Sequence, residues 1–154
     1  MIQTKIRIAG INKLSLNNGD GCRVVLFLQG CYHKCAGCQN PDTWSFSGGG
    51  ETWDVGTLAE HIWRILVDHP IDGLTLSGGD PVYQEEACVE LLDLLPDDLN
   101  VWLYTGFVYE EIKNRPLVKR CEVIVDGPYI EELKCEGKMY GSSNQRIIRK
   151  GREV

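Results

Sequence analysis

The chain has 154 residues and a formal net charge of −6, with 43% hydrophobic and 25% charged residues, which is ordinary for a globular protein of one domain. No apolar run approaches the roughly 20 residues of a membrane-spanning helix, residues 1–5 lack a signal-peptide pattern, and the negative charge argues against a general nucleic-acid binder. We therefore expect a single cytoplasmic domain over residues 1–154, with neither a membrane nor nucleic acid among its partners.

Apolar runs and helical periodicity alternate along the chain. An edge strand is expected over residues 6–8, and helices are expected from Thr57, with Glu60 completing a capping box, over residues 88–95 and over residues 109–114. Four continuous apolar runs predict strands buried on both faces, at residues 24–28, 73–77, 101–104 and 123–125.

This alternation predicts an α/β fold with a mostly parallel sheet of about four to five strands and right-handed crossovers. Ligands of parallel sheets bind beyond the carboxyl ends of the strands. The segments that leave those ends, where the chemistry is expected, are 29–41, 77–81, 105–106 and 126–128.

The C-terminal segment differs from the rest of the chain. It shows no clear periodicity from about residue 129, which predicts irregular structure. From Lys134 onward it carries six Lys and Arg against two Glu. A basic end of this kind can meet an acidic partner or phosphate groups, and a solvated tail is an equally good interpretation.

Seven cysteines in a chain without a secretion signal favour metal or redox chemistry over a disulfide framework. Cys31, Cys35 and Cys38 lie on one loop directly after the first buried strand. Thiolates suit iron–sulfur clusters and zinc alike, but this spacing differs from the paired Cys-x-x-Cys of zinc ribbons. Three ligands on a cubane cluster would leave its fourth iron open to a substrate. A zinc site of three cysteines with His33 or a distant cysteine is the alternative.

A second motif, Ser77-Gly78-Gly79-Asp80-Pro81, leaves the next predicted strand at its carboxyl end. Two glycines allow backbone to approach a ligand closely, and the Asp80 carboxylate could receive an ammonium group. An ordinary turn before a helix is the alternative interpretation.

Together these motifs resemble those of the radical S-adenosylmethionine (SAM) superfamily, in which a Cys-x-x-x-Cys-x-x-Cys loop and a Gly-Gly-acid motif occur in this order. One branch, the activating proteins of anaerobic ribonucleotide reductase, commonly has a glycine where Gly37 stands; this chain has Gln39 where that branch usually has Tyr. Residues 21–25, 125–129 and 141–146 resemble the same branch.

The resemblance implies an abbreviated, partial βα barrel that is open on one side for a protein substrate. It implies one [4Fe-4S] cluster per chain, bound by Cys31, Cys35 and Cys38. SAM would be bound by Gly37, Cys38, Gln39, Gly78, Gly79, Asp80 and Asp126, and a partner by Ser142, Ser143, Asn144, Gln145 and Arg146.

The implied function is that of an oxidoreductase that reductively cleaves SAM at the cluster. It would thereby generate the glycyl radical on anaerobic ribonucleoside-triphosphate reductase, with a reduced flavodoxin or ferredoxin-type protein as electron donor. Activation of another glycyl-radical enzyme, such as pyruvate formate-lyase, is one alternative. A non-enzymatic zinc-binding interaction module is the other. Cys88 is expected in the core, and Cys22, Cys121 and Cys135 have no matching role.

Overall fold

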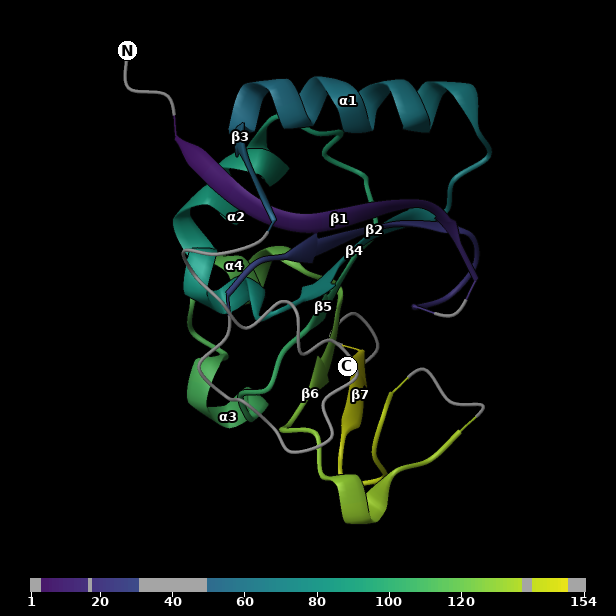
Figure 1. Ribbon diagram of the computed structural model, residues 1–154, viewed down its shortest axis with the longest axis vertical. Helices are drawn as coiled ribbons and strands as arrows, with labels where there is room; N and C mark the ends of the chain where they lie inside the picture. Colours follow the sequence, from purple (N-terminus) through teal and green to yellow (C-terminus); the bar gives the residue numbers. More distant parts are fainter. Residues whose placement is uncertain (1–3, 17, 31–49, 137–139, 150–154) are drawn as a thin grey trace.

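The computed structural model describes residues 4–16, 18–30, 50–136 and 140–149. Within these ranges the strands form one seven-stranded sheet, which curves from β3, beside α1, to the C-terminal strand β7 (Figure 1). The order across the sheet is β3 (Glu51–Asp54), β1 (Lys5–Ser15), β2 (Arg23–Leu28), β4 (Gly73–Gly78), β5 (Val101–Tyr104), β6 (Val123–Asp126) and β7 (Arg146–Arg149).

The centre of the sheet is parallel, as the apolar runs predict. Strands β2, β4, β5 and β6 run side by side in parallel, so their carboxyl ends meet at one edge. The outer strands are antiparallel: β1 pairs with both β2 and β3, and β7 pairs with β6. The α/β prediction is confirmed, whereas the expected strand number was too low and the expected edge strand is the inner strand β1.

Two strands were not predicted from the sequence because they carry no apolar run. β3 has four exposed or half-buried residues, and β7 has the sequence Arg-Ile-Ile-Arg with no fully buried residue. Such segments become strands by pairing with a partner that is already in place. The prediction of irregular structure from residue 129 was therefore wrong for residues 146–149.

The helices are α1 (Val55–Asp68), α2 (Glu85–Asp93), α3 (Tyr109–Ile112) and α4 (Pro116–Arg120), with 3₁₀ turns η2 (Pro81–Gln84) and η3 (Glu131–Leu133). The predicted capping box was wrong, because β3 runs directly into α1 and places Thr57 inside the helix. The five-residue α4 is too short to show helical periodicity. Among the described residues no helix is long and apolar enough to cross a membrane.

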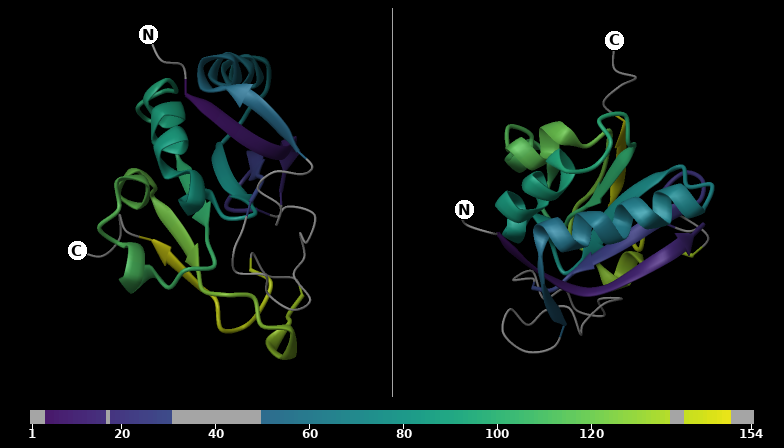
Figure 2. Two further views of the ribbon diagram at one scale, coloured as in Figure 1. Left: turned by 60° about the vertical axis from the view of Figure 1, so that its left-hand side comes forward. Right: turned by 90° about the horizontal axis from the view of Figure 1, so that it is seen from above.

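The larger core lies between the sheet and its helices, which gather on one face in the two views of Figure 2. Leu26, Leu76 and Leu103 point to that side and pack with residues such as Leu58 of α1 and Leu91 of α2. Because side chains alternate along strands, their neighbours point to the other face. There Trp102, Val123 and Val125 form a second cluster with Tyr104, Tyr140 and Ile147. The C-terminal segment is thus part of the fold.

Arg23 lies on this second face of the sheet, at the amino ends of the strands. Its side chain is buried and donates to Thr75 Oγ1 at 2.8 Å and to Asn100 Oδ1 at 2.9 Å, with the guanidinium 5.5 Å from the Trp102 ring centre. Burial lowers the pKa of Arg23, against the opposing effect of Asp20. A pocket of about 650 Å³ opens beside it, at the opposite end of the strands from the predicted site.

Candidate functional site

The two predicted motifs meet at the carboxyl edge of the sheet. Gly79 N donates to Leu28 O at 2.7 Å, and Asp80 N donates to Gly30 O at 2.9 Å. These bonds hold the Gly-Gly-Asp loop against the residues that lead into the cysteine loop. Residues 31–49 lie outside the described ranges. They include Cys31, Cys35, Cys38, Gly37 and Gln39, so the structure gives the departure point of the cysteine loop and not the positions of its ligands.

Glycine is required at this meeting point. A Cβ atom added to Gly79 would lie 2.3 Å from Gly30 O and 2.7 Å from Gly30 C. Gly78 has a φ of +96°, and a Cβ there would lie 2.4 Å from Leu28 N. Both glycines therefore allow two backbone segments to touch. The Gly-Gly-Asp loop therefore lies against Gly30 at this edge of the sheet.

Asp80 is fully buried beside this contact and is bound by groups of the chain itself. Its carboxylate accepts hydrogen bonds from Thr105 Oγ1 at 2.9 and 3.1 Å, from Gly106 N at 2.8 Å and from Val82 N at 3.1 Å. The predicted segment 105–106 is thus brought to the motif, as expected from the strand order. The Asp80 carboxylate anchors that segment from the β4 side.

Gln84, which the sequence did not single out, ties the same region to β1. Its side chain donates to Gln29 O at 3.0 Å and to Arg7 O at 2.8 Å, and accepts from Arg7 N at 2.8 Å. The carbonyl of Gln29 lies just before the cysteine loop, so Gln84 helps to hold the start of that loop. A polar residue in a short turn after Asp80 gives no local sign of this role.

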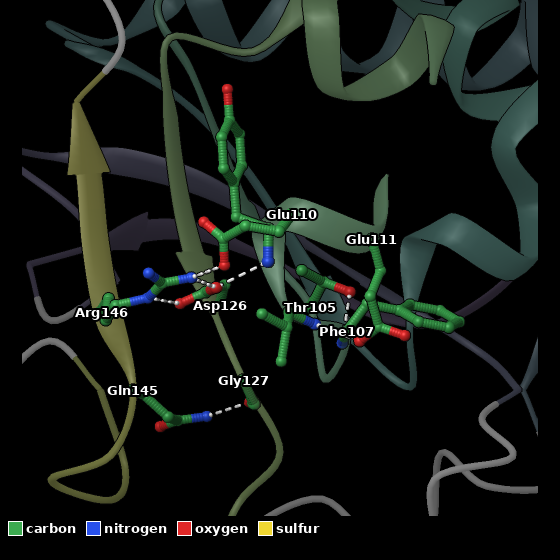
Figure 3. A network of polar contacts seen from close by, with 10 residues as sticks. Thr105, Phe107, Glu110, Glu111, Asp126, Gly127, Gln145 and Arg146 are labelled. Carbon is green, nitrogen blue, oxygen red and sulfur yellow. Dashed lines mark hydrogen bonds and ion pairs between the residues drawn. The ribbon is translucent and has the colours of Figure 1, made fainter. Parts of the chain in front are cut away.

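Asp126 lies at the carboxyl end of β6, as predicted, with only 1% of its surface exposed. Its carboxylate accepts from Arg146 Nε at 3.1 Å, from Arg146 Nη2 at 2.5 Å and from Tyr109 N at 2.7 Å (Figure 3). Arg146 Nη2 also donates to Glu110 Oε1 at 2.7 Å. This network could not be predicted from the sequence, because its members come from three separate elements, β6, α3 and β7.

The segment predicted to bind a partner folds back on the loop after β6. Gln145 Nε2 donates to Gly127 O at 2.9 Å, and Asn144 Nδ2 donates to Pro128 O at 2.8 Å. Ser142 is fully buried and donates to Asn144 Oδ1 at 2.6 Å. Ser142 therefore has no exposed surface in the structure, and its contact with a partner stays a prediction. Ser143 and Arg146 keep exposed surface.

The cysteines of the described ranges are free thiols. Cys88 lies in the core as predicted, and burial raises the pKa of its thiol. Cys121 is buried as well, while Cys22 and Cys135 are half-buried. Over the part of the chain that the structure describes, no three His, Cys, Asp or Glu side chains are grouped to hold a metal ion.

Comparisons with known proteins agree on one group. Residues 17–148 match a family described as a 4Fe-4S single cluster domain. The chain is 39% identical over 136 residues to the anaerobic ribonucleoside-triphosphate reductase-activating protein of Enterobacteria phage T4, covering 84% of this chain and 85% of that protein. The activating proteins of Haemophilus influenzae and Escherichia coli K12 are 36% and 32% identical, covering 86% and 84% of this chain and 90% of each relative.

A solved structure shares the fold. QueE from Escherichia coli superposes with a TM-score of 0.56 at 18% sequence identity, covering 82% of this chain and 61% of QueE. At this identity the likeness concerns the arrangement of strands and helices alone.

Proposed function

Because the chain belongs to the family of anaerobic ribonucleoside-triphosphate reductase-activating proteins and carries its 4Fe-4S domain, we propose that it is a radical SAM enzyme that activates such a reductase. It forms the glycyl radical on the reductase, which is its protein substrate. The observation that carries this proposal is the contact of Gly79 with Gly30, since it joins the Gly-Gly-Asp loop to the start of the cysteine loop.

In this proposal Cys31, Cys35 and Cys38 hold the cluster. Three thiolates suit iron–sulfur chemistry and leave one iron without a protein ligand. Gly30, from which their loop departs, is bound to Asp80 N and lies against Gly79. The residues therefore fit the cluster in two respects. The donors are thiolates, and the contact of Gly30 with Gly79 fixes the point from which their loop departs.

SAM would bind at the carboxyl ends of β4, β5 and β6. The residues that we assign to this site are Gly37, Cys38, Gln39, Gly78, Gly79, Asp80 and Asp126. When bound, the cluster and SAM supply the one-electron chemistry that generates a glycyl radical. The chain contributes the shape of the site: Asp80 and Asp126, both buried and hydrogen-bonded, hold the segment that follows β5, at Gly106 and at Tyr109.

The partner assignments complete the proposal. The exposed Ser143 and the accessible part of Arg146 are candidates for contact with the reductase, with Asn144 and Gln145 supporting them from within. A reduced flavodoxin or ferredoxin-type protein would deliver the electron, and the chain would act in the cytoplasm.

The test uses the full chain, reconstituted anaerobically with iron and sulfide. We expect a brown protein with about four irons per chain that cleaves SAM to methionine and 5′-deoxyadenosine under reducing conditions. With the anaerobic reductase and SAM, electron paramagnetic resonance should show a glycyl radical on the reductase. A colourless protein that binds zinc in place of iron would overturn the proposal. SAM cleavage with no radical on this reductase would refute the choice of substrate.

A further inference from the structure

We propose that Arg146 is a positioning residue that keeps the loops after β5 and β6 in place at the cofactor face by holding Asp126 and Glu110. This role differs from the partner contact expected of Arg146 from the sequence. The inference rests on the proposed function for its activity measurements. The hydrogen-exchange measurement that also tests it does not depend on that function.

The guanidinium is what allows Asp126 to be buried. Two nitrogen atoms of Arg146 meet the two carboxylate oxygens, at 3.1 and 2.5 Å, while Asp126 has 1% of its surface exposed. A buried carboxylate without a charged partner is costly, and a two-pronged arginine contact fixes direction as well as charge. The hydrogen bonds to Asp126 raise the pKa of Arg146 most, and the hydrogen bond to Glu110 raises it further. The cation is thus retained.

The same network fixes the beginning of α3. Asp126 Oδ2 accepts from Tyr109 N at 2.7 Å, and Arg146 Nη2 donates to Glu110 Oε1 at 2.7 Å. Figure 3 shows Arg146 reaching from β7 toward both carboxylates. The first two residues of α3 are therefore attached to β6 and β7.

The loop before α3 is held from both sides. On one side Asp80 accepts from Thr105 Oγ1 and from Gly106 N. On the other, Gly127 N donates to Phe107 O at 2.9 Å. Since this loop continues directly into α3, a shift of Asp126 would be passed to Gly106 and so to the Gly-Gly-Asp loop. The network reaches from the C-terminal strand to the proposed SAM site.

Arg146 keeps 48% of its side chain exposed, so it can contact the reductase as well as hold Asp126. The two roles are distinguished by which measurement, SAM binding or radical formation, is impaired. A positioning residue affects SAM binding without any reductase present. A partner contact affects only radical formation on the reductase. A positioning residue also loses its effect once Asp126 is neutral, because it acts through that carboxylate.

The experiment compares Arg146→Gln, Asp126→Asn and the double variant in the reconstituted full chain. Arg149→Gln is the matched control. It removes the same charge from the same strand, and its ion pair with Asp20 lies at the amino end of β6, away from the site. The Arg146→Lys variant keeps the charge but cannot form the two-pronged contact.

The first measurement is amide hydrogen exchange over residues 105–110. We expect faster exchange in Arg146→Gln, and not in Arg149→Gln, because Asp126, the acceptor of the Tyr109 amide, is no longer held in place and the loop before α3 loosens with it. The second is SAM affinity without reductase, which should fall about tenfold in Arg146→Gln, as is usual when a residue that supports a ligand site is removed. Arg149→Gln should stay within about twofold.

The double variant gives the decisive comparison. If Arg146 acts through Asp126, adding Arg146→Gln to Asp126→Asn causes no further loss, so the double variant binds SAM as strongly as Asp126→Asn alone. Arg146→Lys then recovers part of the affinity that Arg146→Gln loses. Additive losses, or normal exchange and SAM affinity with reduced radical yield, would overturn the inference and assign Arg146 to the partner surface. If the wild-type protein does not bind SAM, the proposed function is wrong, and the exchange data still test the positioning role.

Discussion

The Gly79→Ala variant adds one methyl group at the point where the Gly-Gly-Asp loop touches the start of the cysteine loop. The new Cβ would lie 2.3 Å from Gly30 O, 2.7 Å from Gly30 C and 2.9 Å from Gly30 N. These are backbone atoms, so no side-chain rotation can make room. The two loops have to separate, and Gly30 carries the cysteine loop with it.

The expected destabilisation follows from two contributions. Overpacking of a well-packed site costs about 1–3 kcal/mol. Separation also weakens the hydrogen bonds from Gly79 N to Leu28 O and from Asp80 N to Gly30 O, each worth about 0.5–1.5 kcal/mol. We expect a loss of about 2–4 kcal/mol in the free energy of unfolding. For a chain of this size that corresponds to a fall in Tm of about 5–15 °C.

The matched control is Gly56→Ala in α1. A Cβ at Gly56 meets no atom within 4 Å, and alanine is favoured over glycine in helices by up to about 1 kcal/mol. The same chemical change should therefore leave stability unchanged or raise it. Denaturant unfolding and iron content are measured on both variants, and Gly79→Ala should lose iron as well as stability. Wild-type Tm and iron content in Gly79→Ala, or equal destabilisation by Gly56→Ala, would show that the contact between Gly79 and Gly30 does not hold the two loops together.

Four further predictions concern the site and its support. Replacing Cys31, Cys35 or Cys38 with Ala should abolish iron binding, whereas Cys22→Ala should retain about four irons; iron loss in Cys22→Ala would contradict the three-cysteine assignment. Asp80→Ala should cost about 2–5 kcal/mol in denaturant unfolding, because buried donors of Thr105 and Gly106 lose a charged acceptor, and wild-type stability would argue against the anchoring role. Since burial raises the pKa of the Cys88 thiol, iodoacetamide at about pH 8 should modify Cys88 only after unfolding; mass spectrometry would show rapid labelling of the folded protein if this is wrong. Truncation after Gly141 removes β7 from the sheet and uncovers the Trp102 cluster, so we expect a loss of folded protein, which native circular dichroism of the truncated chain would contradict.

The parallel centre of the fold, and the edge of the sheet where the candidate site is expected, could both be predicted from the sequence. A strand buried on both faces has to be apolar throughout, so β2, β4, β5 and β6 appear directly as apolar runs. Once strands are parallel, their carboxyl ends share one edge, and the segments after Leu28, Gly78, Tyr104 and Asp126 are brought together without further information. The spacing of the cysteines likewise pointed to the cluster, because ligand chemistry is a local property.

The partner of each residue at this edge, by contrast, became known from the folded structure. Gly79 meets Gly30, Asp80 meets Thr105, and Asp126 meets Arg146, across 49, 25 and 20 positions of the chain. Local patterns report propensity and burial, whereas these pairings depend on where separate elements come to rest against one another. The same reason explains β7: its sequence, two isoleucines between two arginines, resembles a solvated tail until β6 provides a strand to pair with and Trp102 provides a surface to cover.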